Sequence, residues 1–219
     1  MQWDFQSLLN NWRALLTGLT GTLSLAVVCI LAAALIGLVV GAGRYSRRGF
    51  ARWPATAFVE FFRNTPVLVL IIWFYFAFPI LTGQKLSAFT AAAIAISLNG
   101  GAFAAEIFRG GMQSLARGQW DAARAIGMNY PQLMRRVILP QAIKRMLPAF
   151  TNRAIEILKT TAIASIVAYY ELLHSARVIA AADFNPIEAY TAVAIIFFAL
   201  VYPLTIVARS VERRLRVSE

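Results

Sequence analysis

Ionisable, amide and hydroxyl side chains stand inside stretches of this sequence that are otherwise apolar. A charge at membrane depth is costly, so such residues indicate by default a pathway for a polar solute. Glu60 precedes Arg63 by three positions, and Glu156 precedes Lys159 by three, which would place each pair on one face of a helix. Each pair could bind a solute that carries both charges, or could be a neutral helix–helix contact without a ligand. The candidate pathway residues are Glu60, Arg63, Asn64, Thr65, Glu106, Glu156, Lys159 and Thr160.

The sequence shows few residues or motifs that could support catalysis. The sequence has one histidine, His174, and one cysteine, Cys29, and it contains no Gly-x-Ser-x-Gly motif and no metal-ligand pair. It also lacks the Gly-x-x-x-x-Gly-Lys-Ser/Thr loop that binds nucleotide phosphates. We therefore expect no catalytic residue, no metal site and no cofactor in this chain, and Cys29 is interpreted as a small apolar filler.

The elements that must position the polar residues are membrane helices. The 219-residue sequence is 59% hydrophobic and 14% charged, with a mean hydropathy of +0.64. A soluble domain of this size could not bury that much apolar surface, so lipid must solvate part of it. The net charge of +11 could suggest nucleic acid, but the basic residues form short runs between apolar stretches. We expect membrane lipid, and no nucleic acid, as a partner.

Five apolar stretches are long enough to cross a bilayer as helices. Backbone groups in lipid must be bonded within the segment, and barrel strands would be shorter and alternating, so the predicted fold is all-α. The fourth stretch is the hardest to place, because Arg153, Glu156 and Lys159 interrupt it. The expected spans cover residues 19–42, 58–81, 87–108, 140–167 and 189–208.

The distribution of basic residues predicts the orientation. Positive charges favour the cytoplasmic side of a membrane protein, and here they follow spans one, three and five. The N-terminus is therefore expected outside and the C-terminus in the cytoplasm. The first apolar stretch is too long for a signal peptide and is followed by Arg44–Arg48, so we expect it to stay as a span. Gly37 and Gly41 match the small-xxx-small spacing of closely packed membrane helices.

The cytoplasmic loop over about 109–140 contains the stretch RGQWDAARAIGMNYPQLMRRVILP. Asp121 could cap a short alanine-rich helix that Gly127 ends, and Pro131 could begin a second one. Two short helices at an angle, projecting from the membrane, could insert into a groove of another protein.

This loop resembles the signature of permease subunits of bacterial ATP-binding-cassette (ABC) importers. That signature reads Glu-Ala-Ala, three residues, Gly, nine residues, Ile, any residue, Leu-Pro. Ala122, Ala123, Gly127, Leu139 and Pro140 match it, whereas Asp121 replaces the glutamate and Val137 the isoleucine. The Arg117-Gly118-Gln119 and Gln141-Ala142 sequences, and the stretch FFRNTPVLVLIIWFYFAFP in span two, resemble the polar amino-acid branch of these permeases.

The resemblance implies a single transmembrane domain with the MetI-like fold of type I importers, in the bacterial inner membrane. It implies as partners two ATPase subunits that bind ATP and Mg²⁺, a second permease, and a periplasmic amino-acid-binding protein. Ala122, Ala123 and Gly127 would fit a cleft on the ATPase. The implied coupling residues are Gly118, Asp121, Ala122, Ala123, Gly127, Leu139 and Pro140.

The implied substrate is a polar amino acid. Arg63, Arg153 and Lys159 favour an acidic or amide side chain, such as that of glutamate or aspartate, although Glu60, Glu106 and Glu156 balance them. An identical copy and a sister subunit both stay open as the second permease. The alternatives are a secondary transporter or channel subunit without ATP coupling, an intramembrane enzyme, and a scaffold subunit.

Overall fold

The structure, a computed structural model, describes residues 6–216, and all the regular structure in that range is helical. The N-terminal half contains α1 (Gln6–Asn10), α2 (Trp12–Tyr45), α3 (Gly49–Asn64), α4 (Val67–Ile72), the π-helix η1 (Trp73–Ala77), α5 (Phe78–Thr82) and α6 (Ala88–Gln113). The C-terminal half contains α7 (Arg117–Ala125), α8 (Tyr130–Leu133), the π-helix η2 (Met134–Ile138), α9 (Leu139–Thr160), the 3₁₀-helix η3 (Thr161–Val167), α10 (Leu172–Asp183) and α11 (Pro186–Arg216).

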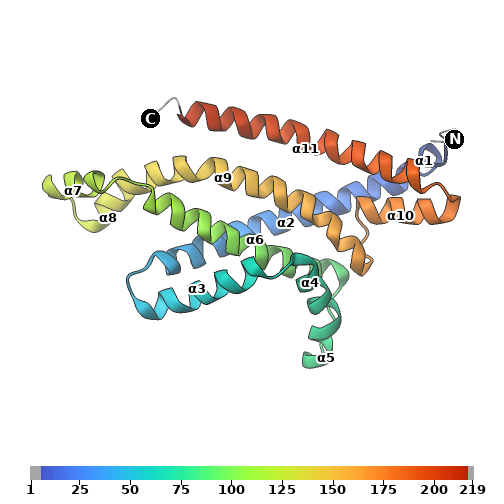
Figure 1. The fold of residues 1–219 in the computed structure, drawn as a ribbon, viewed down its shortest axis with the longest axis horizontal. Helices are drawn as coiled ribbons and strands as arrows, with labels where there is room; N and C mark the ends of the chain where they lie inside the picture. Colours follow the sequence, from blue (N-terminus) through green and yellow to red (C-terminus); the bar gives the residue numbers. More distant parts are fainter. Residues whose placement is uncertain (1–5, 217–219) are drawn as a thin grey trace.

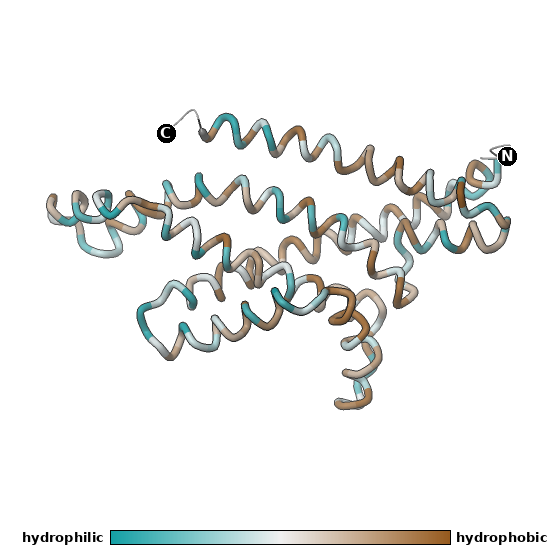
Figure 2. The backbone as a smooth tube through the Cα atoms, viewed as in Figure 1, coloured by the Kyte–Doolittle hydropathy of each residue, from teal (hydrophilic) through white to brown (hydrophobic). Residues whose placement is uncertain are grey.

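Four long helices, α2, α6, α9 and α11, run along the length of the molecule (Figure 1). Helices α7 and α8 form one end, α1 and α10 lie at the other, and α4–α5 projects sideways from the bundle (Figure 1). Hydrophobic residues dominate the middle of the long helices and the α4–α5 segment, whereas hydrophilic residues concentrate toward the α7 end (Figure 2). This is the distribution expected of a membrane bundle with one strongly polar end.

The most extensive contact between two helices is that of α2 with α6. A Cβ atom added to Gly37 would clash with Ala104, and one added to Gly41 would lie 2.8 Å from Cβ of Phe108. The small residues at these positions therefore allow the two backbones to approach, as the spacing predicted.

By length and composition, α2, α6 and α11 can each cross a membrane, and the bent segment 49–82 can count as a fourth span. Helix α9 does not meet these criteria, because charged residues are distributed along its whole length. The predicted fourth stretch, 140–167, corresponds to α9 together with η3, so its last turns are 3₁₀ instead of α.

The expectation of a continuous helix over 58–81 was wrong. The chain bends by 101° between α3 and the segment 67–82. Pro66 has no N–H to donate and disfavours the helical conformation of the preceding residue, and Thr65 is extended, with φ −95° and ψ 126°. The apolar composition continues across this break, which is why hydropathy alone suggested one helix.

Two prolines also explain the two π-helices. Pro79 and Pro140 follow closely after η1 and η2, and the residue before each proline, Phe78 or Leu139, donates its N–H five residues back instead of four. The wider turn, with one extra residue, accommodates the N–H that proline lacks, so the helix continues past it.

Candidate functional site

The loop between α6 and α9 folds back on the molecule as two short helices. Ala123 of α7 is 4% exposed and packs in an apolar cluster with Met112, Leu133 and Ile138. Asp121, Ala122 and Gly127 are exposed, and Ile126 is 73% exposed. The loop is therefore anchored by one alanine and presents a different face outward.

The two alanines that the resemblance assigns to a partner cleft differ in accessibility, because Ala123 is buried and Ala122 is exposed. Successive helical residues are about 100° apart around the axis, so Ala122 and Ala123 cannot share a face. Ala123 belongs to the apolar core beneath the loop, and Ala122 is the alanine that is accessible at the surface. Among the other coupling candidates, Gly118 and Pro140 are exposed and Leu139 is half-buried.

Asp121 is not a helix cap, contrary to the prediction. Helix α7 begins at Arg117, four residues earlier, after Ala116, which makes no side-chain cap. Asp121 instead lies within the helix, with a carboxylate oxygen 3.7 Å from Arg124.

The end of α7 follows the prediction. Gly127 has a φ of +78°, and the N–H of Met128 donates to the carbonyl of Ala123 at 3.1 Å. Asn129 and Gln132 then form a reciprocal capping box at the start of α8, where Pro131 occupies the first turn.

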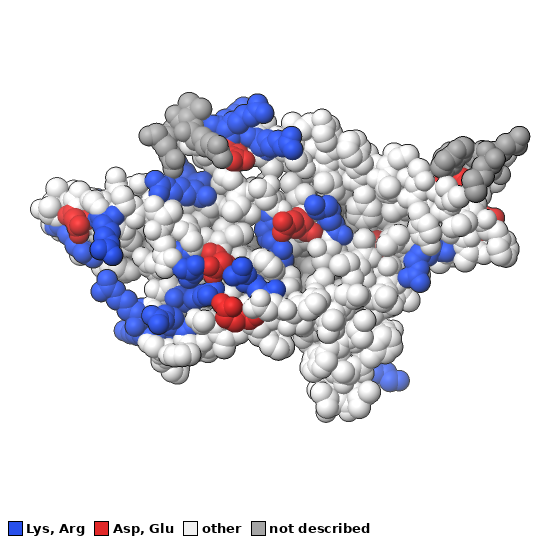
Figure 3. Space-filling model, viewed as in Figure 1, with Lys and Arg blue, Asp and Glu red and all other residues white. Residues whose placement is uncertain are grey.

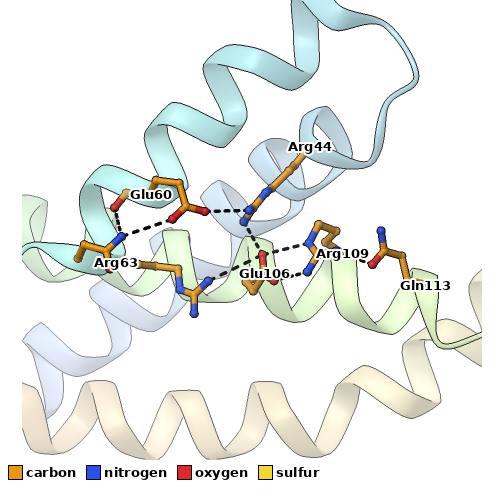
Figure 4. Close-up of polar contacts among 7 residues, drawn as sticks. Arg44, Glu60, Arg63, Glu106, Arg109 and Gln113 are labelled. Atoms are coloured by element: carbon orange, nitrogen blue, oxygen red, sulfur yellow. Dashed lines mark hydrogen bonds and ion pairs between the residues drawn. The ribbon is translucent and has the colours of Figure 1, made fainter.

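Glu106 of α6 is the centre of a charge cluster between α2, α3 and α6 (Figure 4). It forms ion pairs with Arg44 of α2 and Arg109 of its own helix, and its carboxylate lies 3.9 Å from Arg63 of α3. Arg44 also donates to Glu60 at 2.9 Å. Three helices are thus joined through one carboxylate that is one-quarter exposed.

A second polar cluster joins α3, α6 and α9. Arg153 donates to Glu156 and to the side-chain oxygen of Asn99, each at 2.9 Å. Asn99 in turn donates to the carbonyl of Phe62 at 2.8 Å. The guanidinium groups of Arg63 and Arg153 lie 5.1 and 4.1 Å from the ring centre of Phe103. These cation–π contacts link the two clusters.

The charge pairs predicted along single helices are not the pairs that form. Glu60 contacts Arg44, and Arg63 contacts Glu106. Among the described residues, Glu156 pairs with Arg153 and not with Lys159. Glu60 and Arg63 thus pair across helices, with α2 and α6, whereas Glu156 pairs with the arginine three positions before it on its own helix.

The remaining candidate pathway residues bond locally or lie elsewhere. Asn64, Thr65 and Thr160 donate to carbonyl groups one turn back in their own helices. Lys159 lines a separate groove with Phe197 and Tyr202 of α11. The structure thus brings Glu60, Arg63, Asn64 and Glu106 together and places Lys159 apart.

A buried carboxyl lies near the α1–α10 end. Glu171, between the predicted fourth and fifth spans, has no exposed surface and accepts the N–H groups of Leu173 and His174 at 2.9 and 2.7 Å. Burial raises the pKa of Glu171 from 4.5 to about 7, although these two N–H groups oppose the shift. Gly18 and Gly21 of α2 make room for the chain beside it, because a Cβ at Gly18 would lie 2.9 Å from the carbonyl of Glu171.

Comparison with known proteins identifies the family of this chain. A protein-family model described as "Binding-protein-dependent transport system inner membrane component" matches residues 30–217. The chain belongs to this family. It is a permease: the multi-pass, non-catalytic inner-membrane component of a bacterial ABC transporter.

The permease is similar to the glutamine transport system permease protein GlnP of Escherichia coli (strain K12). The two are 33% identical over 218 residues, which covers 99% of this chain and 100% of the relative. It is also similar to a crystal structure of an amino acid ABC transporter with histidines, with a TM-score of 0.92, 34% identity, and coverage of 98% of this chain and 100% of the other. These similarities place the permease in the polar amino-acid branch.

The fold is MetI-like. An inward-facing structure of the MetNI methionine ABC transporter matches with a TM-score of 0.77 at 23% identity, covering 92% of the permease and 96% of that chain. At this identity the likeness concerns the fold alone.

The sequence carries little signal for the polar residues that complete the clusters. In the sequence, the positions of Arg44 and Arg109 indicate orientation, and nothing distinguishes Asn99 or Phe103, because a single polar or aromatic residue in an apolar helix carries no periodic signal. Arg44 and Arg109 did carry one usable signal, since each is the first basic residue after an apolar span. Within residues 6–216, no group of three or more His, Cys, Asp or Glu side chains could hold a metal ion.

Proposed function

We propose that this permease forms half of the pathway of an ATP-driven importer of polar amino acids, and that the loop 109–140 couples it to an ATPase. The supporting observation is the division of α7 into two faces. Ala123 fixes the helix to the molecule's own core, while Asp121, Ala122 and Gly127 are accessible. A helix held in this way moves as a rigid body with the bundle and can transmit a displacement.

The proposed complex contains a second permease, either an identical copy or a sister subunit, two ATPase subunits and a periplasmic binding protein. ATP and Mg²⁺ belong to the ATPase subunits. Closure of the ATPase pair would draw the two α7 helices together and rock the bundles between inward- and outward-facing states.

The proposed topology has five spans: α2, the bent α3–α5 segment, α6, α9 with η3, and α11. The N-terminus is periplasmic and the C-terminus cytoplasmic. Lys and Arg side chains gather over α7, α8 and the α2–α3 turn, at one end of the molecule, and are sparse at the other (Figure 3). This asymmetry supports the orientation. Two of the charges of α9 are compensated within the helix, because Arg153 pairs with Glu156 and its side chain is only 15% exposed.

For the substrate we propose an acidic or amide amino acid, recognised near Arg63, Arg153 and Asn99. Each of the two arginines has a buried Nε–H without a partner in the structure. A carboxylate could accept hydrogen bonds from such guanidinium groups. The E. coli relative is named for glutamine, whose side-chain amide has a carbonyl oxygen that can also accept hydrogen bonds. Glu156 offers the opposite charge for the ammonium group.

Reconstitution tests the proposal. The permease with its ATPase subunits in proteoliposomes should hydrolyse ATP and accumulate labelled glutamine or glutamate only when the binding protein is present. Uptake without an ATPase subunit would contradict the importer assignment. Arg153→Gln should reduce uptake at least tenfold while the ATPase subunits stay bound, and Arg52→Gln, an exposed arginine outside both clusters, should not.

A further inference from the structure

A basic pocket of about 770 Å³ opens between the turn that joins α2 to α3 and helix α7. The charge clusters do not account for it, and of the accessible α7 residues named above it includes only Asp121. Its lining residues are Tyr45, Ser46, Arg47, Arg48, Arg117, Trp120, Asp121, Arg124 and Tyr130.

The pocket carries an excess of positive charge. Four arginines face one carboxylate, and that carboxylate, Asp121, is already paired with Arg124 at 3.7 Å. Within the described part of the chain, the guanidinium groups of Arg47, Arg48 and Arg117 have no acidic partner. Unpaired guanidinium groups that line one cavity favour an anion with several acceptor oxygens, such as a phosphate ester.

The surroundings of the pocket are those of a lipid–water interface. The last turns of α2 expose Val39, which is 74% accessible, and the first turns of α3 expose Phe50 and Trp53, at 94% and 74%. Large aromatic side chains are enriched at the level of lipid headgroups, and Trp120 and Tyr130 add two more to the pocket wall. The arginines therefore lie beside apolar side chains that can contact acyl chains.

We propose that this pocket binds the phosphate group of an anionic phospholipid and joins the membrane surface to α7. Basic pockets beside membrane helices on the cytoplasmic side are suited to such headgroups. An acidic protein segment would satisfy the arginines but would gain nothing from the exposed apolar side chains next to them. The pocket arginines and the exposed apolar side chains together match a phospholipid, which has both a charged headgroup and acyl chains.

The test compares lipid binding to the assembled transporter and to two double variants. Arg47→Gln with Arg117→Gln removes two arginines of the pocket. Arg52→Gln with Arg209→Gln removes two exposed arginines, one in α3 and one in α11, that do not line it. Native mass spectrometry in detergent would measure binding of phosphatidylglycerol, cardiolipin and phosphatidylcholine to each complex.

We expect the dissociation constant for phosphatidylglycerol to rise about 25-fold in the pocket variant, since each arginine near an anionic headgroup contributes about fivefold. The control variant should change it by less than about threefold, and phosphatidylcholine should bind weakly throughout. The single variant Arg47→Gln should show about a fivefold effect, which keeps the test valid if the double variant assembles poorly.

Three results would overturn the proposal. Equal loss in both double variants would indicate diffuse surface charge. Competition by glycerol phosphate as effective as that by the lipid would indicate a soluble phosphate ligand. Release of the ATPase from the pocket variant with unchanged lipid binding would indicate an acidic protein segment. None of these measurements uses transport, so a failed lipid site leaves the proposed function untouched, and a failed importer assignment leaves this test intact.

Discussion

At the residue scale, Gly127 combines a constrained backbone with an open surface. Its φ of +78° favours glycine, and no atom lies within 4 Å of the place where a Cβ would stand. Gly127→Arg should keep the permease in the membrane but abolish ATP-driven uptake, because the long side chain would occupy the surface that we propose contacts the ATPase. Uptake assays with membrane quantification by immunoblot would measure this.

Gly127→Asn is the matched control, since asparagine tolerates this conformation better than other residues. It should retain most of the uptake. Normal transport by Gly127→Arg would remove the coupling role from this surface.

Glu171 gives the permease a pH-dependent stability. Its pKa is raised from 4.5 to about 7, so between these values the folded state binds more protons than the unfolded state. The stability of the fold should therefore fall as pH rises from about 4.5 to 7 and stay constant above, with a contribution of at most about 3 kcal/mol.

Glu171→Gln removes this titration. We expect the apparent Tm of the variant, relative to the native protein, to increase between pH 5 and pH 8 in thermal unfolding of the purified complex. A difference in Tm that does not change with pH would show that the carboxyl does not titrate in this range.

Glu106 holds three arginines from three helices. Glu106→Gln would leave Arg44, Arg63 and Arg109 without this shared neutralising charge, and partly buried unpaired charges are costly. We expect the apparent Tm to fall by several degrees. Asp121→Asn breaks an exposed pair at 3.7 Å and should change the Tm little. Similar changes in Tm for the two substitutions would show that the ion pairs of Glu106 contribute no more to stability than an exposed surface pair.

At the element scale, the contact between α2 and α6 depends on glycines of the first span. Gly37→Ala would press its methyl group into Ala104 and should cost about 1–3 kcal/mol. In the control variant Gly110→Ala, on α6, the added methyl group meets open space. This substitution should be neutral or stabilising, since alanine favours helix. Thermal unfolding would compare the two variants, and equal Tm values would argue against close packing at Gly37.

At the scale of the whole molecule, the proposed topology places the α5–α6 turn and α7 on opposite sides of the membrane. In a Cys29→Ala background, Gln84→Cys should react with a membrane-impermeant maleimide in intact spheroplasts. Arg124→Cys should react only after permeabilisation, because both positions are exposed but face different compartments. Labelling of both in intact spheroplasts would contradict the proposed orientation.

The sequence alone determined the class of the protein, the two short helices between α6 and α9, and the turn at Gly127. These properties rest on local signals: hydropathy over about twenty residues, the placement of basic residues, and fixed spacings of glycine, proline and alanine. The break at Thr65-Pro66 was also encoded locally, but the uninterrupted apolar composition concealed it.

Tertiary structure alone decided which charges pair and which alanine faces outward. Arg44 reaches Glu106 across 62 positions of sequence, and Arg153 reaches Asn99 across 54. Such contacts are set by where helices cross, which no periodicity within one helix predicts. Ala122 and Ala123 are chemically identical neighbours, and only the packing of α7 against its own core separates the exposed residue from the buried one.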